Sequence, residues 1–257
     1  MSLEAKGLSY SIANHQILTE IHASFLEGQV NVLAGPNGAG KTTFLKALCG
    51  EINCEVGGVT IDGRSIRDFK LVELSKLRSV MTQSTAVVFD FSVAEILEMS
   101  WLSGSHRKFE ELMFVLCKNC EIKDLISRKF RSLSGGEKQR VLFVRALLQV
   151  ATQSVEDGKN QYIFLDEPTA SLDVAHELKV LQLCREQADN GFGVIIVLHD
   201  LNLASRFADR IFLLDQGQIR IQGSPEEVLS SALLTKLYGT QIIVEKNELV
   251  NRLVVHS

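Results

Sequence analysis

Residues 35–43 read Gly-Pro-Asn-Gly-Ala-Gly-Lys-Thr-Thr, and this stretch limits the possible folds of the chain more than any other. It matches the phosphate-loop pattern G-x-x-x-x-G-K-[ST], whose glycines let the backbone turn its N–H groups toward one point. An apolar run at 30–34 has the pattern of a buried strand, and a helical pattern follows at 43–48. Because strand, loop and helix stand in the order that the motif requires, we predict a nucleoside-triphosphate site rather than a glycine-rich turn that binds nothing.

The chemistry of this loop assigns roles to its functional groups. A helix that begins at the loop presents free N–H groups and the positive end of its dipole to a phosphate. We expect Lys41 to contact the β- and γ-phosphates and the Thr42 hydroxyl to bind Mg²⁺. The residues predicted to bind the nucleotide are Gly35, Pro36, Asn37, Gly38, Ala39, Gly40, Lys41, Thr42 and Thr43.

Two carboxylates follow a second apolar run, at 162–165. Asp166 stands directly after this predicted strand, where a carboxylate commonly holds Mg²⁺ through water. Glu167 is the next residue, and we expect it to polarise or orient the attacking water. For an isolated Asp-Glu pair, a solvated strand end would be a competing interpretation. The phosphate loop upstream favours the catalytic one.

His199 ends the next predicted strand, at 194–198. Parallel strands place their carboxyl ends at one edge of a sheet, and ligands bind at that edge. Residues at predicted strand ends are therefore expected to converge: Lys41, Gln83, Asp166 and His199. We predict that His199 contacts the γ-phosphate. The other histidines lack such a position and receive no role: His15, His22, His106, His176 and His256.

A second glycine-containing turn lies at 133–137, which reads Leu-Ser-Gly-Gly-Glu and precedes a helical pattern. Ser134 suits the N-cap of that helix, and Gly135 and Gly136 expose backbone N–H groups, so this is a second helix start able to bind phosphate. One nucleotide does not need two such sites. The second site is explained if it completes a nucleotide site in another copy of the chain. Residues 134–136 are called the signature turn below.

Composition excludes several classes of protein. The 257 residues are 46% apolar, enough for a substantial core, and their net charge of −4 argues against a nucleic-acid partner. No apolar run is long enough to span a bilayer and no signal-peptide pattern is present, so we expect the chain in the cytosol unless a partner holds it at a membrane. The five cysteines are expected to be free thiols, and the CxxC at 117–120 is interpreted as structural.

Hydrophobic periodicity predicts an α/β fold with a mixed, mainly parallel sheet, and the phosphate loop makes a P-loop NTPase core the expected form of that fold. Residues 1–26 alternate with a period of two, which predicts an N-terminal antiparallel β subdomain. Residues 92–148 are helical in period, and we expect an inserted helical subdomain from about 84 to 138 that carries the signature turn. The flanking residues, 1–83 and 139–257, form the core of a single domain in this prediction, with a polar connection at 149–161.

The ordered set of motifs covers nearly the whole chain and resembles the ATP-binding subunits of ABC transporters. The stretches that carry the resemblance are 35–43, Gln83, 133–137, 162–167, 170–173 and His199. The resemblance implies a head-to-tail homodimer in which each ATP lies between the phosphate loop of one chain and Ser134, Gly135 and Gly136 of the other. It further implies that Glu167 is the catalytic carboxylate and that hydrolysis lets the dimer reopen.

Two more roles are implied by the same resemblance. Gln83 would touch Mg²⁺ and sense the membrane partner, and Asp173 would communicate between the two nucleotide sites. The family usually stacks an aromatic residue on adenine just after the first strand. This chain has Ile12 there, with Tyr10 two residues earlier as a candidate.

Softer similarities indicate which transporter the chain serves. Three stretches resemble the importers of vitamin B12, siderophores and haem: 91–97, 199–204 and 223–229. Three further features resemble haem-importer ATPases in particular: the Ala-His in 171–177, the polar connection at 149–161 and the ending at 233–239. Haem import is the resulting expectation, and ferric siderophore or vitamin B12 import is the main alternative. An exporter subunit, or a soluble ABC ATPase of DNA repair or translation, is a further alternative.

An importer of this kind implies particular partners and a location. Polytopic permease subunits would hold the chain at the cytoplasmic face of the inner membrane. An extracytoplasmic substrate-binding protein would act through the permease. The cargo would be contacted by those proteins, so no residue of this chain need touch it.

Overall fold

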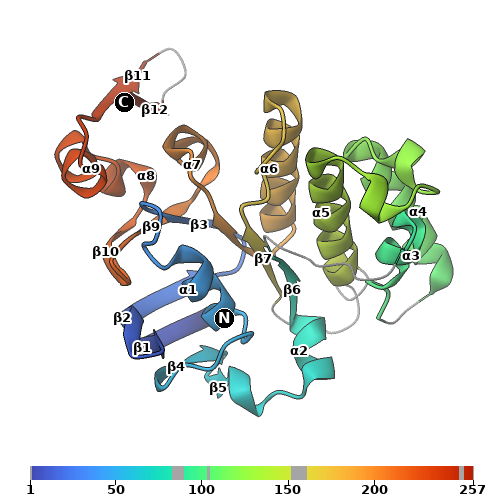
Figure 1. Ribbon diagram of the computed structural model, residues 1–257, viewed down its shortest axis with the longest axis horizontal. Helices are drawn as coiled ribbons and strands as arrows, with labels where there is room; N and C mark the ends of the chain where they lie inside the picture. Colours follow the sequence, from blue (N-terminus) through green and yellow to red (C-terminus); the bar gives the residue numbers. More distant parts are fainter. Residues whose placement is uncertain (1, 83–89, 103–104, 152–160, 249–251, 257) are drawn as a thin grey trace.

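The computed structural model describes residues 2–82, 90–102, 105–151, 161–248 and 252–256 (Figure 1). The N-terminal part forms a four-stranded antiparallel sheet in the order β2-β1-β4-β5. Its strands are β1 (Ser2–Ile12), β2 (His15–Leu26), β4 (Val56–Ile61) and β5 (Arg64–Ser65). Ala13 and Asn14 join β1 to β2 with φ of 48° and 64°, the left-handed pair that a tight hairpin turn needs. The alternation of residues 1–26 thus predicted the antiparallel strands correctly.

A six-stranded sheet in the order β10-β9-β3-β8-β7-β6 forms the centre of the fold. Its strands are β3 (Val30–Ala34), β6 (Arg78–Met81), β7 (Tyr162–Asp166), β8 (Gly193–Val197), β9 (Arg210–Asp215) and β10 (Gln218–Gly223). All neighbours pair in parallel except β10, which returns antiparallel to β9. The sheet is therefore the mixed, mainly parallel one that the apolar runs predicted.

Both faces of this sheet are buried, because successive side chains along a strand point to opposite sides. In β3, Val30 and Val32 pack with the helices on one face, whereas Leu33 packs toward the four-stranded sheet and α1 (Lys41–Leu48) on the other. In β8, Ile196 and Ile195 divide between the two faces in the same way. This explains why these strands are continuous apolar runs rather than alternating ones.

A group of helices lies to one side of the sheet, at the right in Figure 1. It consists of α3 (Val93–Glu98), α4 (His106–Asn119) and α5 (Gly135–Ala151), with short 3₁₀ turns at Lys123–Leu125 and Phe130–Ser132 between α4 and α5. A further 3₁₀ turn, at Ile66–Asp68, follows β5. Ser92 and Glu95 form a capping box at the start of α3. Residue 138, the expected end of the helical subdomain, lies inside α5. That helix also runs three residues into the stretch that was predicted as a polar connection, since it ends at Ala151.

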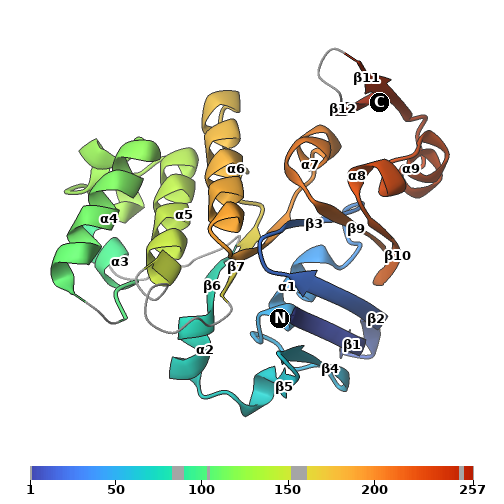
Figure 2. The ribbon, with the colours of Figure 1, turned by 180° about the vertical axis from the view of Figure 1, so that it is seen from behind.

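The remaining helices are α2 (Leu71–Leu77), α6 (Val174–Asp189), α7 (Leu201–Phe207), α8 (Pro225–Val228) and α9 (Ser231–Tyr238). The view from behind shows α6 between the α3–α5 group and the C-terminal elements (Figure 2). The chain closes with a hairpin of β11 (Ile243–Asn247) and β12 (Arg252–His256), which the sequence did not predict. Asn202 of α7 fixes this hairpin by donating to the Val255 carbonyl and accepting from its N–H.

The described residues bear out the expectation of free thiols. All five cysteines are free and buried. No helix among the described residues combines the length and the apolar character needed to cross a membrane.

Candidate nucleotide site

Three neighbouring strands bring the predicted site residues to one edge of the central sheet. The order β3-β8-β7 places Leu33, Val197 and Asp166 side by side in register. One or two residues beyond these positions the chain reaches Gly35, His199 and Glu167. The convergence predicted from strand ends is therefore present for the described residues. Gln83 lies outside them, and its predicted role stays a prediction.

The phosphate loop needs glycine at two positions for different reasons. Gly35 has a φ of 141°, and a Cβ there would lie 2.1 Å from the Leu214 carbonyl oxygen, so any side chain would collide with β9. Gly40 has a φ of 96°, the left-handed conformation that other residues rarely adopt, and it caps α1. The first N–H groups of α1 consequently face the hollow of the loop.

Lys41 is the first residue of α1 and lies folded into the loop. Its Nζ donates to the carbonyl oxygens of Gly35 and Pro36, each at 2.8 Å, and the residue is only 6% exposed. Burial lowers the pKa of Lys41, while Asp166 and Glu167 nearby act in the opposite direction. The ammonium group thus stands beside the point at which the loop amides converge.

Asp166 is the most deeply buried carboxylate of the site, at 1% exposure. Its Oδ1 accepts a hydrogen bond from the Thr42 hydroxyl at 3.0 Å, and its Oδ2 has no partner among the described residues. Burial raises the pKa of this carboxyl above its usual value. An unsatisfied carboxylate oxygen beside a hydroxyl is a donor set that suits Mg²⁺, which prefers oxygen ligands and keeps several of its waters.

Glu167 and His199 form a pair at the mouth of the site. His199 Nε2 lies 2.6 Å from Glu167 Oε1, and the side chains are 47% and 18% exposed respectively. Glu167 has a φ of 52°, an uncommon conformation for this residue type that other contacts must hold in place. One such contact is a hydrogen bond of 2.7 Å from the Gln139 side chain on α5 to the Glu167 carbonyl.

An open cavity of about 300 Å³ joins these groups. Its wall contains the loop from Asn37 to Thr43 together with Glu167, His199 and Ile17. Ile17, on β2, was not singled out in the sequence. The two candidates for adenine contact, Tyr10 and Ile12, are not among the residues lining this cavity.

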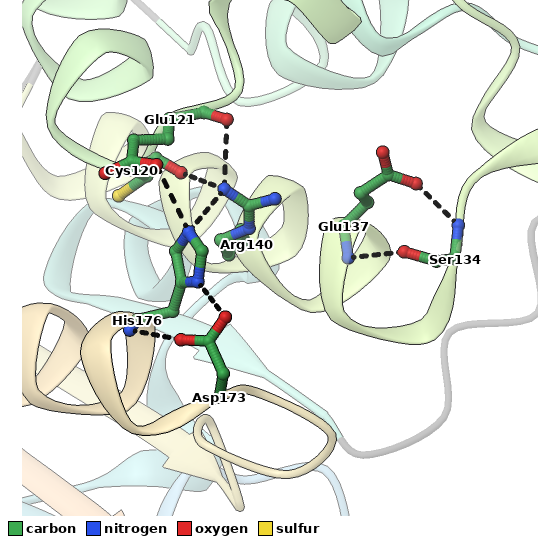
Figure 3. A network of polar contacts seen from close by, with 7 residues as sticks. All are labelled: Cys120, Glu121, Ser134, Glu137, Arg140, Asp173 and His176. Carbon is green, nitrogen blue, oxygen red and sulfur yellow. Dashed lines mark hydrogen bonds and ion pairs between the residues drawn. The ribbon is translucent and has the colours of Figure 1, made fainter.

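The signature turn is built as the sequence predicted but lies apart from this cavity, whose lining does not include it. Ser134 accepts from the Glu137 N–H at 3.3 Å, and Glu137 in return accepts from the Ser134 N–H at 2.7 Å (Figure 3). The hydrogen bond from the Ser134 N–H lowers the pKa of the Glu137 carboxyl. Asp173 caps α6 and likewise lies away from the cavity, so the chain by itself presents two separate groups of predicted site residues.

Comparison with known proteins identifies the family. The ABC transporter family matches this chain over residues 18–170. The chain belongs to the ABC transporter family. Among its relatives is the hemin import ATP-binding protein HmuV of Ruegeria sp. (strain TM1040), 36% identical with 96% of this chain and 94% of the relative covered. HmuV of Pseudoalteromonas translucida (strain TAC 125) is 38% identical over 95% of this chain and 94% of the relative.

Solved structures of this family share the fold. The ATP-binding subunit of an ABC transporter superimposes with a TM-score of 0.78 at 22% identity, covering 94% of this chain and 95% of that one. A bacterial ABC transporter cassette described as dimeric has a TM-score of 0.74 at 25% identity, covering 87% and 98%. The predicted fold class is confirmed, and membership of the family establishes the chain as an ATP-binding subunit with ATPase activity coupled to transport.

The structure also adds contacts to this ABC subunit that sequence patterns did not reveal. Gln139 and Arg140 of α5 reach the Glu167 carbonyl and the His176 ring respectively. The Tyr238 hydroxyl hydrogen-bonds the backbone of Gly35 from the far end of the chain. All of these contacts join residues at least 28 positions apart in the chain, so no local pattern could have shown them.

Proposed function

We propose that this chain is the ATP-hydrolysing subunit of a haem importer and that it works as a homodimer. The observation that carries the enzymatic part is the single cavity shared by the phosphate loop, Glu167 and His199. The cargo follows from the relatives, since proteins named hemin import ATP-binding protein match from end to end. The softer similarities in 171–177 and 233–239 agree with the same cargo.

The phosphate loop would hold the nucleotide. Its backbone N–H groups and the start of α1 surround the phosphates, and Lys41 moves its ammonium group from the Gly35 and Pro36 carbonyls to the β- and γ-phosphate oxygens. Because this movement exchanges two carbonyl acceptors for charged ones, it gains charge-assisted hydrogen bonds.

Thr42 and Asp166 would hold Mg²⁺, with Gln83 as the third predicted ligand. The Thr42 hydroxyl and the unpaired Asp166 Oδ2 are the groups that fit it. When bound, the ion supplies positive charge that offsets the charge on the phosphates. The same positive charge would offset the free-energy cost of burying the Asp166 carboxylate.

Glu167 would orient the attacking water and accept its proton as the water oxygen bonds to the γ-phosphorus and the bridge to ADP breaks. His199 holds Glu167 through the 2.6 Å contact and is placed to donate to a γ-phosphate oxygen. A hydrogen bond from His199 to the substrate would compete with this pair, so nucleotide binding would release Glu167 toward the water.

A homodimer would complete each site with the signature turn of the second copy. Ser134 and Gly135 are exposed, as is Asp173, so all three are available to another chain. The dimeric cassette at 25% identity supports this arrangement. Asp173, in this proposal, lies at the contact between the two nucleotide sites.

The partners follow from the importer class. Permease subunits in the membrane would bind this chain on their cytoplasmic side, and an extracytoplasmic binding protein would deliver the cargo to them. The α3–α5 group, as the proposed helical subdomain, would move relative to the core as ATP is bound and hydrolysed.

The test is ATPase activity of the reconstituted complex with permease and binding protein. We expect haem delivered by the binding protein to stimulate hydrolysis, and Glu167→Gln to remove the stimulated rate. Matched samples receive a ferric siderophore or vitamin B12. Stimulation by one of these and none by haem would reverse the cargo, and ATPase activity indifferent to every cargo would contradict the importer proposal.

A further inference from the structure

The signature turn and the loop before α6 are packed directly against each other. A Cβ on Gly136 would lie 2.8 Å from the Ser171 carbonyl oxygen, whereas one on Gly135 would lie 3.7 Å from the Ser171 side chain. Gly136 is therefore needed for this close approach. Residues 170–173, called the aspartate loop here, are therefore packed closely against the start of α5.

A polar network continues this contact one helical turn further on (Figure 3). Arg140 lies four residues after Gly136 and so on the same face of α5. Its Nη1 lies 3.0 Å from His176 Nε2 and donates to the Cys120 and Glu121 carbonyl oxygens at 2.9 Å each. The network thus connects α5 both to the end of α4 and to α6.

His176 completes the connection to the aspartate loop. Its backbone N–H donates to Asp173 Oδ1 at 2.9 Å, and its ring Nδ1 lies 2.8 Å from Asp173 Oδ2. Both oxygens of the carboxylate are therefore held by one residue. His176 is mostly covered, with a side chain 23% exposed, although Asp173 itself is 66% exposed.

The ring of His176 lies between oppositely charged groups on two elements. Its Nδ1 faces the Asp173 carboxylate, and its Nε2 faces the Arg140 guanidinium, whose Nη1 also donates to the Cys120 and Glu121 carbonyl oxygens. Glu121 Oε2 also lies 3.4 Å from Nε2, but that side chain is 74% exposed and Arg140 is closer. The ring therefore bridges Arg140 of α5 and Asp173 of the aspartate loop.

We infer that His176 is a positioning residue that holds Asp173 and the signature turn in one fixed arrangement for presentation to the second copy of the chain. This inference rests on the proposed homodimer. It names the contact that holds together the two elements, the signature turn and the aspartate loop, that each copy presents to the other. Without the bridge, α5 and the start of α6 would each meet the partner in a range of orientations. Only a part of the molecules would then be ready to close over ATP.

The test uses Glu167→Gln as the parent, because this change keeps bound ATP intact and so favours the closed dimer. The ATP concentration at half-dimerisation is measured by gel filtration or small-angle scattering for the parent and for the parent with His176→Ala. We expect the double variant to need about tenfold more ATP, the size set by the loss of one charge-assisted hydrogen bond. ADP affinity, measured on monomers, should not change, because His176 is remote from the phosphate loop.

Three further variants separate positioning from folding. His176→Asn keeps a side-chain amide where Nδ1 stood, and His176→Gln keeps one where Nε2 stood. Since each retains only half of the bridge, neither should restore dimerisation to the parent level. His106→Ala is the matched control, since His106 is a helical histidine with a carboxylate four residues on and, within the described residues, no hydrogen bond or ion pair to α6.

The outcomes are distinct for the two claims. A parent that dimerises, together with a His176→Ala variant that dimerises at the same ATP concentration, overturns the inference and leaves the proposed function standing. Full restoration of dimerisation by His176→Asn also overturns the inference, because dimerisation would then not depend on the contact with Arg140. A parent that stays monomeric at saturating ATP overturns the homodimer itself, and the inference with it.

Discussion

The buried carboxylate of Asp166 lowers the stability of the nucleotide-free protein and favours the binding of Mg²⁺ with ATP. Its replacement by asparagine separates these two effects. The carboxylate is 1% exposed, and only one of its oxygens has a partner among the described residues. A buried acceptor without a partner costs about 1–3 kcal/mol. Because the amide of Asp166→Asn removes the charge but still leaves one unpaired group, we take the lower end, about 1 kcal/mol.

The expected result is a more stable protein in the absence of nucleotide. For a chain of this size 1 kcal/mol corresponds to about 2–4 °C in Tm. The folded-state pKa of Asp166 is raised, so its cost is complete above the folded pKa and absent below the unfolded value of about 3.9. The difference in Tm between the variant and the wild-type protein should therefore be largest at neutral pH and should become smaller as the pH falls.

The same substitution should abolish most of the stabilisation by Mg²⁺-ATP. A ligand at a hundred times its Kd stabilises by about 2.7 kcal/mol, which the wild-type protein should show with ATP and Mg²⁺ but much less with ATP and EDTA. In the variant, the stabilisation by ATP with Mg²⁺ should differ little from that by ATP with EDTA. Differential scanning fluorimetry over a pH series measures both effects.

Asp209→Asn is the matched control, because Asp209 accepts from the Val30 N–H and from Arg185. That carboxylate is satisfied, so its loss should lower Tm rather than raise it. If Asp166→Asn lowers the Tm of the nucleotide-free protein as much as the control does, the argument about the unpaired oxygen is wrong.

Three other substitutions test separate parts of the account. Lys41→Ala should weaken ATP binding at least about tenfold by calorimetry, since it removes a charge-assisted contact to phosphate, and unchanged affinity would refute that role. Gly136→Ala should destabilise the fold by about 1–3 kcal/mol in urea unfolding, because its Cβ would lie too close to the Ser171 carbonyl oxygen. Gly135→Ala should not destabilise the fold, because its Cβ would meet only ordinary contacts. Equal effects of the two substitutions would refute the close-packing argument. Ser92→Ala should cost about 1 kcal/mol by removing the α3 cap, whereas Ser230, which makes no side-chain cap bond, should be replaceable at little cost.

Sequence patterns located the site because its parts follow local rules. A glycine loop between strand and helix, and charged residues just after apolar strands, are short-range signals, and parallel strands bring them to one edge. The capping boxes at Ser92 and Ser224 are equally local features, since each needs only residues three apart.

The elements that were not predicted depend on distant contacts or on weak local patterns. The strand β11 begins with Ile243 and Val244 but continues with Glu, Lys and Asn and is largely exposed, so its pattern resembles a loop. For His176, the link to Asp173 spans three residues, but Arg140 lies 36 positions away, and only the fold brings the two together. Ile17 likewise reaches the cavity through the pairing of β2 with the rest of the sheet.

Haem transport itself is the most direct measure of the central claim. Proteoliposomes containing the permease and this chain, with ATP and Mg²⁺ supplied on the side that carries the chain and loaded binding protein on the other, would be assayed for haem uptake. The account predicts uptake that requires ATP and that Glu167→Gln abolishes. Haem uptake equally fast with the Glu167→Gln subunit, or none under conditions in which a ferric siderophore is carried, would contradict it.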